Sequence, residues 1–235
     1  MEDQSDNNQK RQSTNNARPG WTMPPKQEPY EQAYVLGFDK LESRDTSPEM
    51  LSKLGASGEG GKIRLQVLNR QVTVDLESRE ILVDSPGSPS AQLRRITRHW
   101  SLLILHYLLA DDVPEDTTEV SLRSFADCRA YASVLGKRIE ARFLATAGRT
   151  SEAFAQASGN VGGVRLDGLR QAYRFRLLPR VPITIIRHEG DEEFGPAANF
   201  ILQRDAEGLL VGEDRIVATE LLIEALSGKP MEQSE

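Results

Sequence analysis

The sequence predicts an α+β domain in which a mainly antiparallel sheet is covered by helices. Short segments of alternating apolar and polar residues lie toward both ends of the 235-residue chain, as in strands that bury one face. Between these segments, apolar residues recur at helical spacing. Turn signals between neighbouring strands favour hairpins, and therefore antiparallel pairing.

The chain is expected to hold a single folded unit with polar ends. Residues 1–28 are rich in Asn, Gln, Asp, Ser and Pro, and Trp21 and Met23 are their few large apolar residues. Such a segment cannot bury enough apolar surface to offset the entropy lost on ordering, so we expect a disordered tail. The predicted domain covers residues 29–228, and residues 229–235 are expected to be disordered as well.

In the first part of the domain the sequence predicts two helices and then strands. Residues 30–41 show near-helical apolar spacing. Ser47 and Pro48 supply a cap and a first-turn proline for a short helix over residues 48–54. Apolar alternation predicts a hairpin and a third strand at residues 63–67, 72–76 and 81–83.

The rest of the domain is predicted to alternate between helices and strands. Residues 91–110 form the clearest helix, and the apolar second half of this segment is expected to pack across the sheet. Further helices are predicted at residues 127–146, 150–158 and 214–226. Extended segments are predicted at residues 120–125, 173–177, 182–187 and 199–203, with a proline-bounded turn at 179–182.

Composition narrows the classes of protein to consider. A net charge of −6 argues against a dedicated nucleic-acid binder, although residues 94–187 carry 15 Lys and Arg against 9 Asp and Glu. The single cysteine, Cys128, cannot form a disulfide within the chain or build a cysteine-ligated cluster, and we interpret it as structural. Neither a signal-peptide pattern nor a membrane-length apolar run is present, so we expect a cytoplasmic protein without a membrane partner.

The densest cluster of acidic residues is a predicted loop around Gly190. Asp191, Glu192 and Glu193 follow this glycine directly, and Glu189 precedes it. Crowded carboxylates can hold Mg²⁺ or Ca²⁺, and a desolvated pair can act as general acid and base. The alternative is a solvated turn whose carboxylates pair with arginines from residues 94–187. Arg123 is the expected partner of this acidic loop.

Two histidines are further candidate site residues. His106 lies in the nearly apolar part of the predicted helix, where it is either a core histidine or a base. His188 lies beside the acidic loop, where neighbouring carboxylates would favour its charged form. No nucleophile elbow, zinc-protease motif, phosphate-binding loop or dinucleotide fingerprint occurs in the sequence.

Several segments resemble a prokaryotic family of unexplained role, domain of unknown function 3786. The resemblance extends over residues 30–226. It is carried by residues 103–109 (LILHYLL), residues 120–125 (VSLRSF), Gly162-Gly163, residues 178–182 (LPRVP) and residues 190–194 (GDEEF). The matched motif positions, which carry no assigned role, are His106, Tyr107, Arg123, Asp191, Glu192 and Glu193.

The resemblance implies no activity or cofactor, and the chain departs from the family in two places. Some members of the family carry a cysteine-rich iron–sulfur region ahead of this domain, where this chain has a polar tail, so a cluster-binding role is not carried over. After the VSLRSF segment, this chain has residues 127–131 (DCRAY) in place of a glycine-aromatic stretch, which leaves the register of the middle helices open.

Three functional hypotheses follow from these patterns. The first is a binding or accessory module whose acidic loop, near Arg123 and His106, recognises a small polar ligand, a metal ion or a protein partner. The second is an enzyme that uses carboxylates with His106 or His188 in acid–base or metal-assisted chemistry. The third is binding of an anion or nucleic acid by the basic middle of the chain. The sequence leaves the cofactor unknown.

Overall fold

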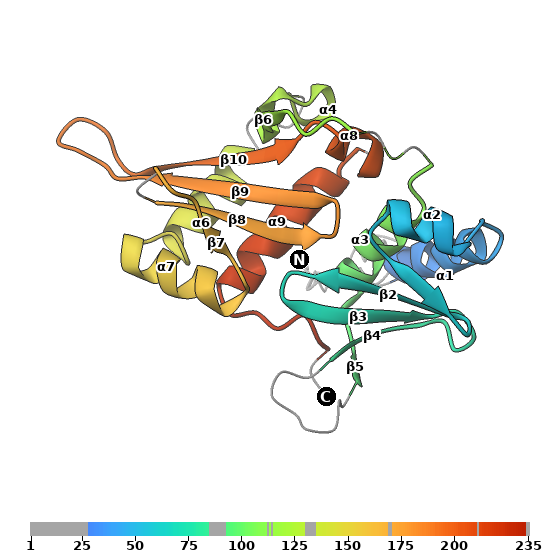
Figure 1. The fold of residues 1–235 in the computed structure, drawn as a ribbon. Helices are drawn as coiled ribbons and strands as arrows, with labels where there is room; N and C mark the ends of the chain where they lie inside the picture. Colours follow the sequence, from blue (N-terminus) through green and yellow to red (C-terminus); the bar gives the residue numbers. More distant parts are fainter. Residues whose placement is uncertain are drawn as a thin grey trace, which may run out of the picture.

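The computed structural model describes residues 28–84, 93–111, 113, 115–129, 135–168, 171–210 and 212–233. Its fold is α+β, with two five-stranded antiparallel sheets, which confirms the predicted class (Figure 1). The first sheet has the strand order β1-β2-β3-β4-β5 and the second has the order β6-β10-β9-β8-β7. The predicted disordered tail lies outside the described residues, apart from Glu28, which begins a helix.

The first sheet is a meander of sequential strands. Its strands are β1 (Ser57–Glu59), β2 (Lys62–Val67), β3 (Arg70–Asp75), β4 (Glu80–Asp84) and β5 (Leu93–Arg95). The predicted hairpin is β2–β3, in which Leu65 pairs with Val72. Because side chains alternate between the two faces of a strand, the buried residues of β2 and β4 form one apolar face.

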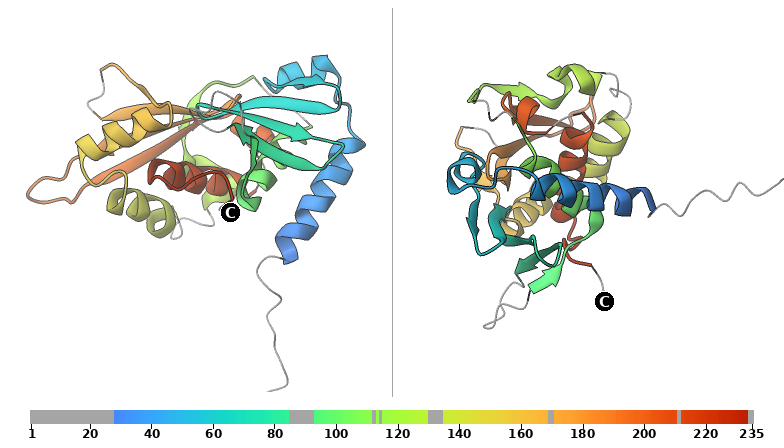
Figure 2. Two further views of the ribbon diagram at one scale, coloured as in Figure 1. Left: turned by 90° about the horizontal axis from the view of Figure 1, so that it is seen from below. Right: turned by 90° about the vertical axis from the view of Figure 1, so that its right-hand side faces the viewer.

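Three helices accompany the first sheet: α1 (Glu28–Glu42), α2 (Pro48–Lys53) and α3 (Arg98–Leu108). The Ser47 hydroxyl caps α2 as predicted, since it accepts a hydrogen bond from the Met50 N–H. The helix predicted from residue 91 begins only at Arg98, because residues 93–95 pair with β4 as strand β5. In the left view of Figure 2, α1, α3 and α9 lie on one side of the layer formed by the two sheets.

The second sheet collects strands from distant parts of the chain. Its strands are β6 (Glu119–Ser121), β7 (Val164–Arg165), β8 (Ala172–Leu178), β9 (Val181–His188) and β10 (Ala197–Gln203). The predicted strands at residues 173–177, 182–187 and 199–203 are confirmed. Its accompanying helical elements are Leu122–Ser124, α4 (Ala126–Arg129), Leu135–Glu140, α6 (Ala141–Ala145), α7 (Ser151–Asn160), α8 (Ala206–Leu209) and α9 (Asp214–Leu226).

The two faces of the second sheet differ in chemistry. Phe175, Ile183 and Phe200 are buried on the face that α6, α7 and α9 cover. Arg174 and Arg176 lie at the alternate positions of β8, so they belong to the opposite face. The edge strand β7 adds Val164 to that face, since Val164 pairs with Arg174. One face of this sheet therefore belongs to the core and the other presents arginines.

The two sheets meet where the β2–β3 turn contacts β8. The backbone N–H of Leu68 lies 2.9 Å from the Arg176 carbonyl oxygen, and Leu68 itself has a positive φ of 54°. Gly162 packs against this turn so closely that a Cβ there would lie 2.7 Å from Asn69 Cβ. The buried apolar side chains of both halves form one continuous cluster.

The C-terminal segment corrects one prediction. Residues 229–235 were expected to be disordered, but Met231 is buried and Glu232 forms a β-bridge with Ile96. Glu232 also forms an ion pair with Arg70 at 3.2 Å. Burial of the Met231 side chain, together with the contacts of Glu232 with Ile96 and Arg70, holds this segment beside the first sheet. Ser234 and Glu235 lie outside the described residues.

The packing of this segment can be tested by truncating its buried side chain. We expect Met231→Ala to lower the free energy of unfolding by about 2 kcal/mol, because the substitution removes buried methylenes and leaves a cavity. Urea denaturation followed by circular dichroism measures this change. Lys229→Ala is the control, since this exposed side chain forms only an ion pair with Glu224. Equal stability of the Met231→Ala variant and the wild type would contradict the packed C-terminus.

Candidate functional site

The turn between β8 and β9 is held by polar contacts with α2, α3 and Asp205. Leu178 pairs with Val181, so Pro179 and Arg180 form a two-residue turn. Pro179 packs against Gly55, where an added Cβ would lie 2.6 Å from the proline Cβ. Gly55 has a positive φ of 64°, so both its conformation and its close packing require glycine at the end of α2.

Tyr107 joins this turn to the end of α2. Its side chain is fully buried, and its hydroxyl donates a hydrogen bond to the Leu54 carbonyl at 2.5 Å. The same hydroxyl accepts a hydrogen bond from the Arg180 backbone N–H at 3.2 Å. Burial raises the pKa of Tyr107 well above its ordinary value, so the phenol stays protonated and can donate. Tyr107 therefore has a structural role at this junction.

The Arg180 side chain bridges the same elements from the other side. It donates to the Lys53 carbonyl at 3.1 Å and lies 3.6 Å from a carboxylate oxygen of Asp205. Asp205 is 1% exposed, and its other carboxylate oxygen has no hydrogen-bond partner among the described residues. Burial raises the pKa of Asp205, although the charge of Arg180 opposes this change. Arg180 is thus held in place at the edge of a groove.

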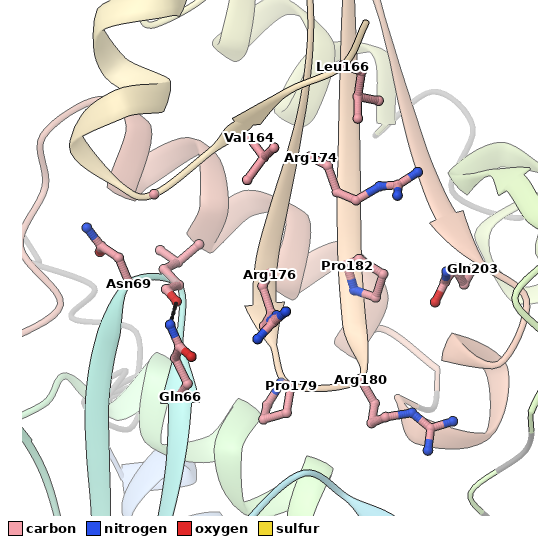
Figure 3. Close-up of a pocket in the computed structure, with 12 residues that line it drawn as sticks. Gln66, Asn69, Val164, Leu166, Arg174, Arg176, Pro179, Arg180, Pro182 and Gln203 are labelled. Carbon is pink, nitrogen blue, oxygen red and sulfur yellow. Dashed lines mark hydrogen bonds between the residues drawn. The ribbon is translucent and has the colours of Figure 1, made fainter.

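An arginine-lined groove of about 450 Å³ runs between the β2–β3 turn and the open face of the second sheet (Figure 3). None of the twelve described residues that line it is acidic. Three are arginines and three are amides, and the other six are glycine, proline or aliphatic residues. The polar lining residues are Arg174, Arg176, Arg180, Gln66, Asn69 and Gln203.

The three arginines differ in how far their charges are neutralised. Arg174 forms an ion pair with Glu119, which lies across the sheet on β6. Arg180 has Asp205 as its partner. The Arg176 side chain is exposed, and it has no ion pair or hydrogen bond within the described part of the chain. Figure 3 shows Arg176 between the other two arginines. The groove thus has one uncompensated guanidinium at its centre.

The opposite wall of the groove includes two amides of the β2–β3 hairpin, Gln66 at the end of β2 and Asn69 in the turn. Gln66 donates a hydrogen bond from Nε2 to the Leu68 carbonyl at 3.0 Å, which is drawn in Figure 3. Asn69 donates from Nδ2 to the Asn160 carbonyl at 3.2 Å. A carbonyl oxygen can only accept a hydrogen bond, so each amide must turn its NH₂ group to its partner. The side-chain oxygens of both residues then remain available as acceptors.

The acidic loop does not form the site that the sequence predicted. The carboxylate of Asp191 accepts hydrogen bonds from the backbone N–H groups of Glu193 and Phe194, which closes the turn and lowers the pKa of Asp191. All three carboxylates are exposed, and none forms an ion pair within the described residues. Only Glu189 lies near an arginine, 4.0 Å from Arg187. The predicted internal pairing of Asp191, Glu192 and Glu193 is therefore wrong.

Arg123 and His188 also have other partners than predicted. Arg123 forms an ion pair with Glu140 at 2.9 Å, and within the described residues no hydrogen bond or ion pair joins it to the acidic loop. His188 ends β9, and its Nε2 lies 3.1 Å from the Asn199 amide nitrogen. Figure 1 shows the β9–β10 loop projecting from the far end of the second sheet, away from α3 and therefore from His106.

His106 forms a pair with a carboxylate that the sequence did not indicate. Its Nδ1 lies 3.0 Å from each carboxylate oxygen of Asp214, the first residue of α9. The hydrogen bond to Asp214 raises the pKa of His106, against the effects of burial and of Lys40. The pair lines a second cavity, of about 950 Å³, at the C-terminal end of α3. His106 is therefore not a core histidine.

Sequence reasoning missed the arginines of the groove, although a signal was present. β8 reads Tyr173-Arg174-Phe175-Arg176, an alternation that places both arginines on the face opposite the phenylalanine. Nothing in the sequence indicated that the β2–β3 turn would face them. Asp205 and Asp214 were missed because each meets its partner only across a long sequence separation.

Comparison with known protein families places the chain in a family. The model of a family described as Domain of unknown function (DUF3786) matches residues 47–225. The chain belongs to this family. The match covers all the groove-lining residues, and two segments that carried the resemblance in the sequence, Gly162-Gly163 and LPRVP, contribute to the lining. No curated protein and no solved structure gives a significant match.

The described residues contain neither a metal-binding cluster nor a membrane-spanning helix. Across those ranges, no group of three or more His, Cys, Asp or Glu side chains is arranged to hold a metal ion. Among the helices of the described part, none is both long and apolar enough to cross a membrane.

The Tyr107 junction can be tested by removing a single hydroxyl. We expect Tyr107→Phe to lower the free energy of unfolding by about 1–3 kcal/mol, because the buried Arg180 N–H and Leu54 carbonyl lose a shared partner. Chemical denaturation measures the change. Tyr173→Phe is the control, since the hydroxyl of this partly buried tyrosine makes no hydrogen bond within the described residues. Similar small losses for both variants would contradict the bridging role of Tyr107.

The His106–Asp214 pair predicts a pH-dependent contribution to stability. The folded-state pKa of His106 is raised above the usual value of about 6.5. The resulting stabilisation is therefore full below that pH and is lost as pH rises through the folded-state pKa. Because His106 is partly exposed, we expect a coupling of less than about 1 kcal/mol.

A double-mutant cycle separates this coupling from other effects of each residue. The cycle combines Asp214→Asn and His106→Gln, with unfolding free energies measured at pH 5.5 and pH 8.5. The coupling should be larger at pH 5.5. The same coupling at both pH values would show that protonated His106 gains nothing from Asp214.

Proposed function

We propose that this protein is a binding module for a small ligand that carries an oxyanion, and that the arginine-lined groove is its binding site. The observation that carries the proposal is Arg176, a guanidinium without a partner in the described residues, placed between two further arginines. Guanidinium groups bind carboxylates and phosphates through paired N–H donors.

Electrostatics supports an anion over a neutral or cationic ligand. Glu119 and Asp205 offset the charges of Arg174 and Arg180, and neither carboxylate lines the groove. An anion in the groove would therefore lie among three guanidiniums, with no acidic side chain among the described lining residues. The groove volume of about 450 Å³ is within the range of pockets for small molecules.

The proposal moves the binding role from the acidic loop to the groove. The Asp191–Glu193 side chains are exposed on a projecting loop, whereas the polar groups of the groove converge on one hollow. A nucleic-acid strand is a poorer fit, since none of the described residues that line the groove is aromatic and could stack on a base. A cytoplasmic, prokaryotic setting is part of the proposal, and the single buried thiol of Cys128 supports it.

Anion binding can be measured directly with inorganic phosphate as the probe. Titration of the full chain in a low-salt imidazole–chloride buffer, which contains no competing oxyanion, should give saturable binding by NMR or calorimetry. We expect Arg176→Gln to weaken it by about tenfold or more, because a hydrogen-bonded charge contributes ~1.5–3 kcal/mol. Arg165→Gln is the matched control, since this exposed arginine pairs with Tyr173 and so lies on the other face of the same sheet.

Two results would contradict the proposed function. The first is that phosphate produces no saturable signal with the wild-type protein. The second is that Arg165→Gln and Arg176→Gln weaken binding equally, which would indicate a general effect of net charge and not a site at the groove.

The alternative function is an acid–base enzyme at the second cavity. The observation that favours it is the His106–Asp214 pair, which holds Nδ1 of the imidazole and leaves Nε2 free of any protein partner within the described residues. A histidine oriented in this way by a carboxylate can take a proton from a ligand. A screen of ester and amide substrates should then detect activity that His106→Gln abolishes and Arg176→Gln leaves unchanged. Activity that survives His106→Gln would exclude this role.

A further inference from the structure

We infer that the ligand of the arginine-lined groove is a hydroxylated oxyanion, of the kind represented by sugar phosphates and sugar acids. This inference rests on the proposed function and makes it more specific. It depends on the chemical difference between the two walls of the groove. The second sheet supplies cationic donors, and the β2–β3 hairpin supplies neutral acceptors.

The cationic wall fixes where the anionic group would lie. Arg176 faces the groove from β8, beside Pro182 of β9, with which it pairs across the strands. Since Arg174 and Arg180 are held by their acidic partners, Arg176 is the guanidinium whose donors are free. An oxyanion bound here forms charge-assisted hydrogen bonds with Arg176 and gains from the flanking charges.

The acceptor wall requires a ligand that also donates hydrogen bonds. Gln66 and Asn69 have committed their NH₂ groups to backbone carbonyls, and their side-chain oxygens accept no hydrogen bond within the described residues, so these oxygens are available as acceptors. A bare anion or an alkyl chain offers these oxygens no donor. Gln203, which has no hydrogen bond within the described residues, can present either end of its amide. A ligand with hydroxyl groups satisfies both kinds of partner.

The donors of the ligand are expected to be neutral hydroxyls and not ammonium groups. A cationic donor would be repelled by the three guanidiniums of the facing wall. A hydroxyl has no such cost, and it can donate to an amide oxygen and also accept from an arginine. The groove therefore suits an oxyanion attached to a polyol, whether the anion is a phosphate or a carboxylate.

Matched ligands test this inference on the full chain. Glucose 6-phosphate is compared with hexyl phosphate, which has the same anionic group on an unhydroxylated chain, and gluconate is compared with hexanoate. The hydroxylated member of each pair should bind about five- to tenfold more tightly, because one or two neutral hydrogen bonds contribute about that much to the affinity. A preference in only one pair identifies that anion as the accepted type.

Gln66→Met tests the assignment of the acceptor wall. This exposed side chain is replaced by one of similar length without an acceptor oxygen, so the preference should fall below about twofold. Binding of inorganic phosphate should remain within about twofold of the wild type, which also shows that the variant is folded. Arg165→Gln serves again as the control and should keep the full preference.

The outcomes separate this inference from the proposed function. Equal binding of hydroxylated and alkyl ligands, or tighter binding of the alkyl ligand, would overturn the inference while the anion site stands. A preference that persists in Gln66→Met would overturn the role of the acceptor wall. If neither inorganic phosphate nor any of the four ligands binds, the proposed function fails together with the inference.

Discussion

The hydroxyl of Tyr107 is the contact on which the arrangement of the two sheets depends. It joins the Leu54 carbonyl, at the end of α2, to the Arg180 N–H in the turn of the second sheet. Both partners are backbone groups that would lose water on burial, so a missing hydroxyl would leave each without compensation. Arg180 strengthens the same junction through the Lys53 carbonyl and Asp205. Polar bonds thereby fix a position that apolar packing alone would specify less sharply.

The candidate groove follows from this junction. Its cationic wall belongs to β8 and the β8–β9 turn, and its acceptor wall belongs to the β2–β3 hairpin, so the groove exists only because the two sheets are held together. The hydrogen bond from the Leu68 N–H to the Arg176 carbonyl oxygen joins the two walls directly. Helices cover the other face of the second sheet, which leaves the arginine-bearing face as the open one. A ligand bound on this open face would not disturb the buried core.

The distribution of charge explains why the acidic loop is not the partner of the basic middle. Arg138 and Arg142 pair with Glu220 and Glu224 of α9, and Arg123 pairs with Glu140. These arginines are satisfied by carboxylates that pack beside them, and the acidic loop projects from the far end of the second sheet. Arg176 differs because its strand faces the β2–β3 hairpin, whose described lining residues, Gln66, Leu68 and Asn69, carry no charge. A chain with a net charge of −6 thus keeps a local cationic site.

Local pattern in the sequence determined the elements of the fold, and tertiary contacts decided the site. The alternation in β2, β3 and β8, the Ser47 cap and the apolar spacing of α9 predicted their elements, because each signal reflects burial or capping within a few residues. Residues 93–95 were assigned to a helix because their pairing with β4 is not local. Tyr107 and Asp214 acquire their partners across 53 and 108 positions of sequence, and Asp205 meets Arg180 from beyond two intervening strands. Gln66 faces Arg176 from another sheet. These pairings cannot be predicted from local patterns in one sequence, because they depend on how the two sheets pack.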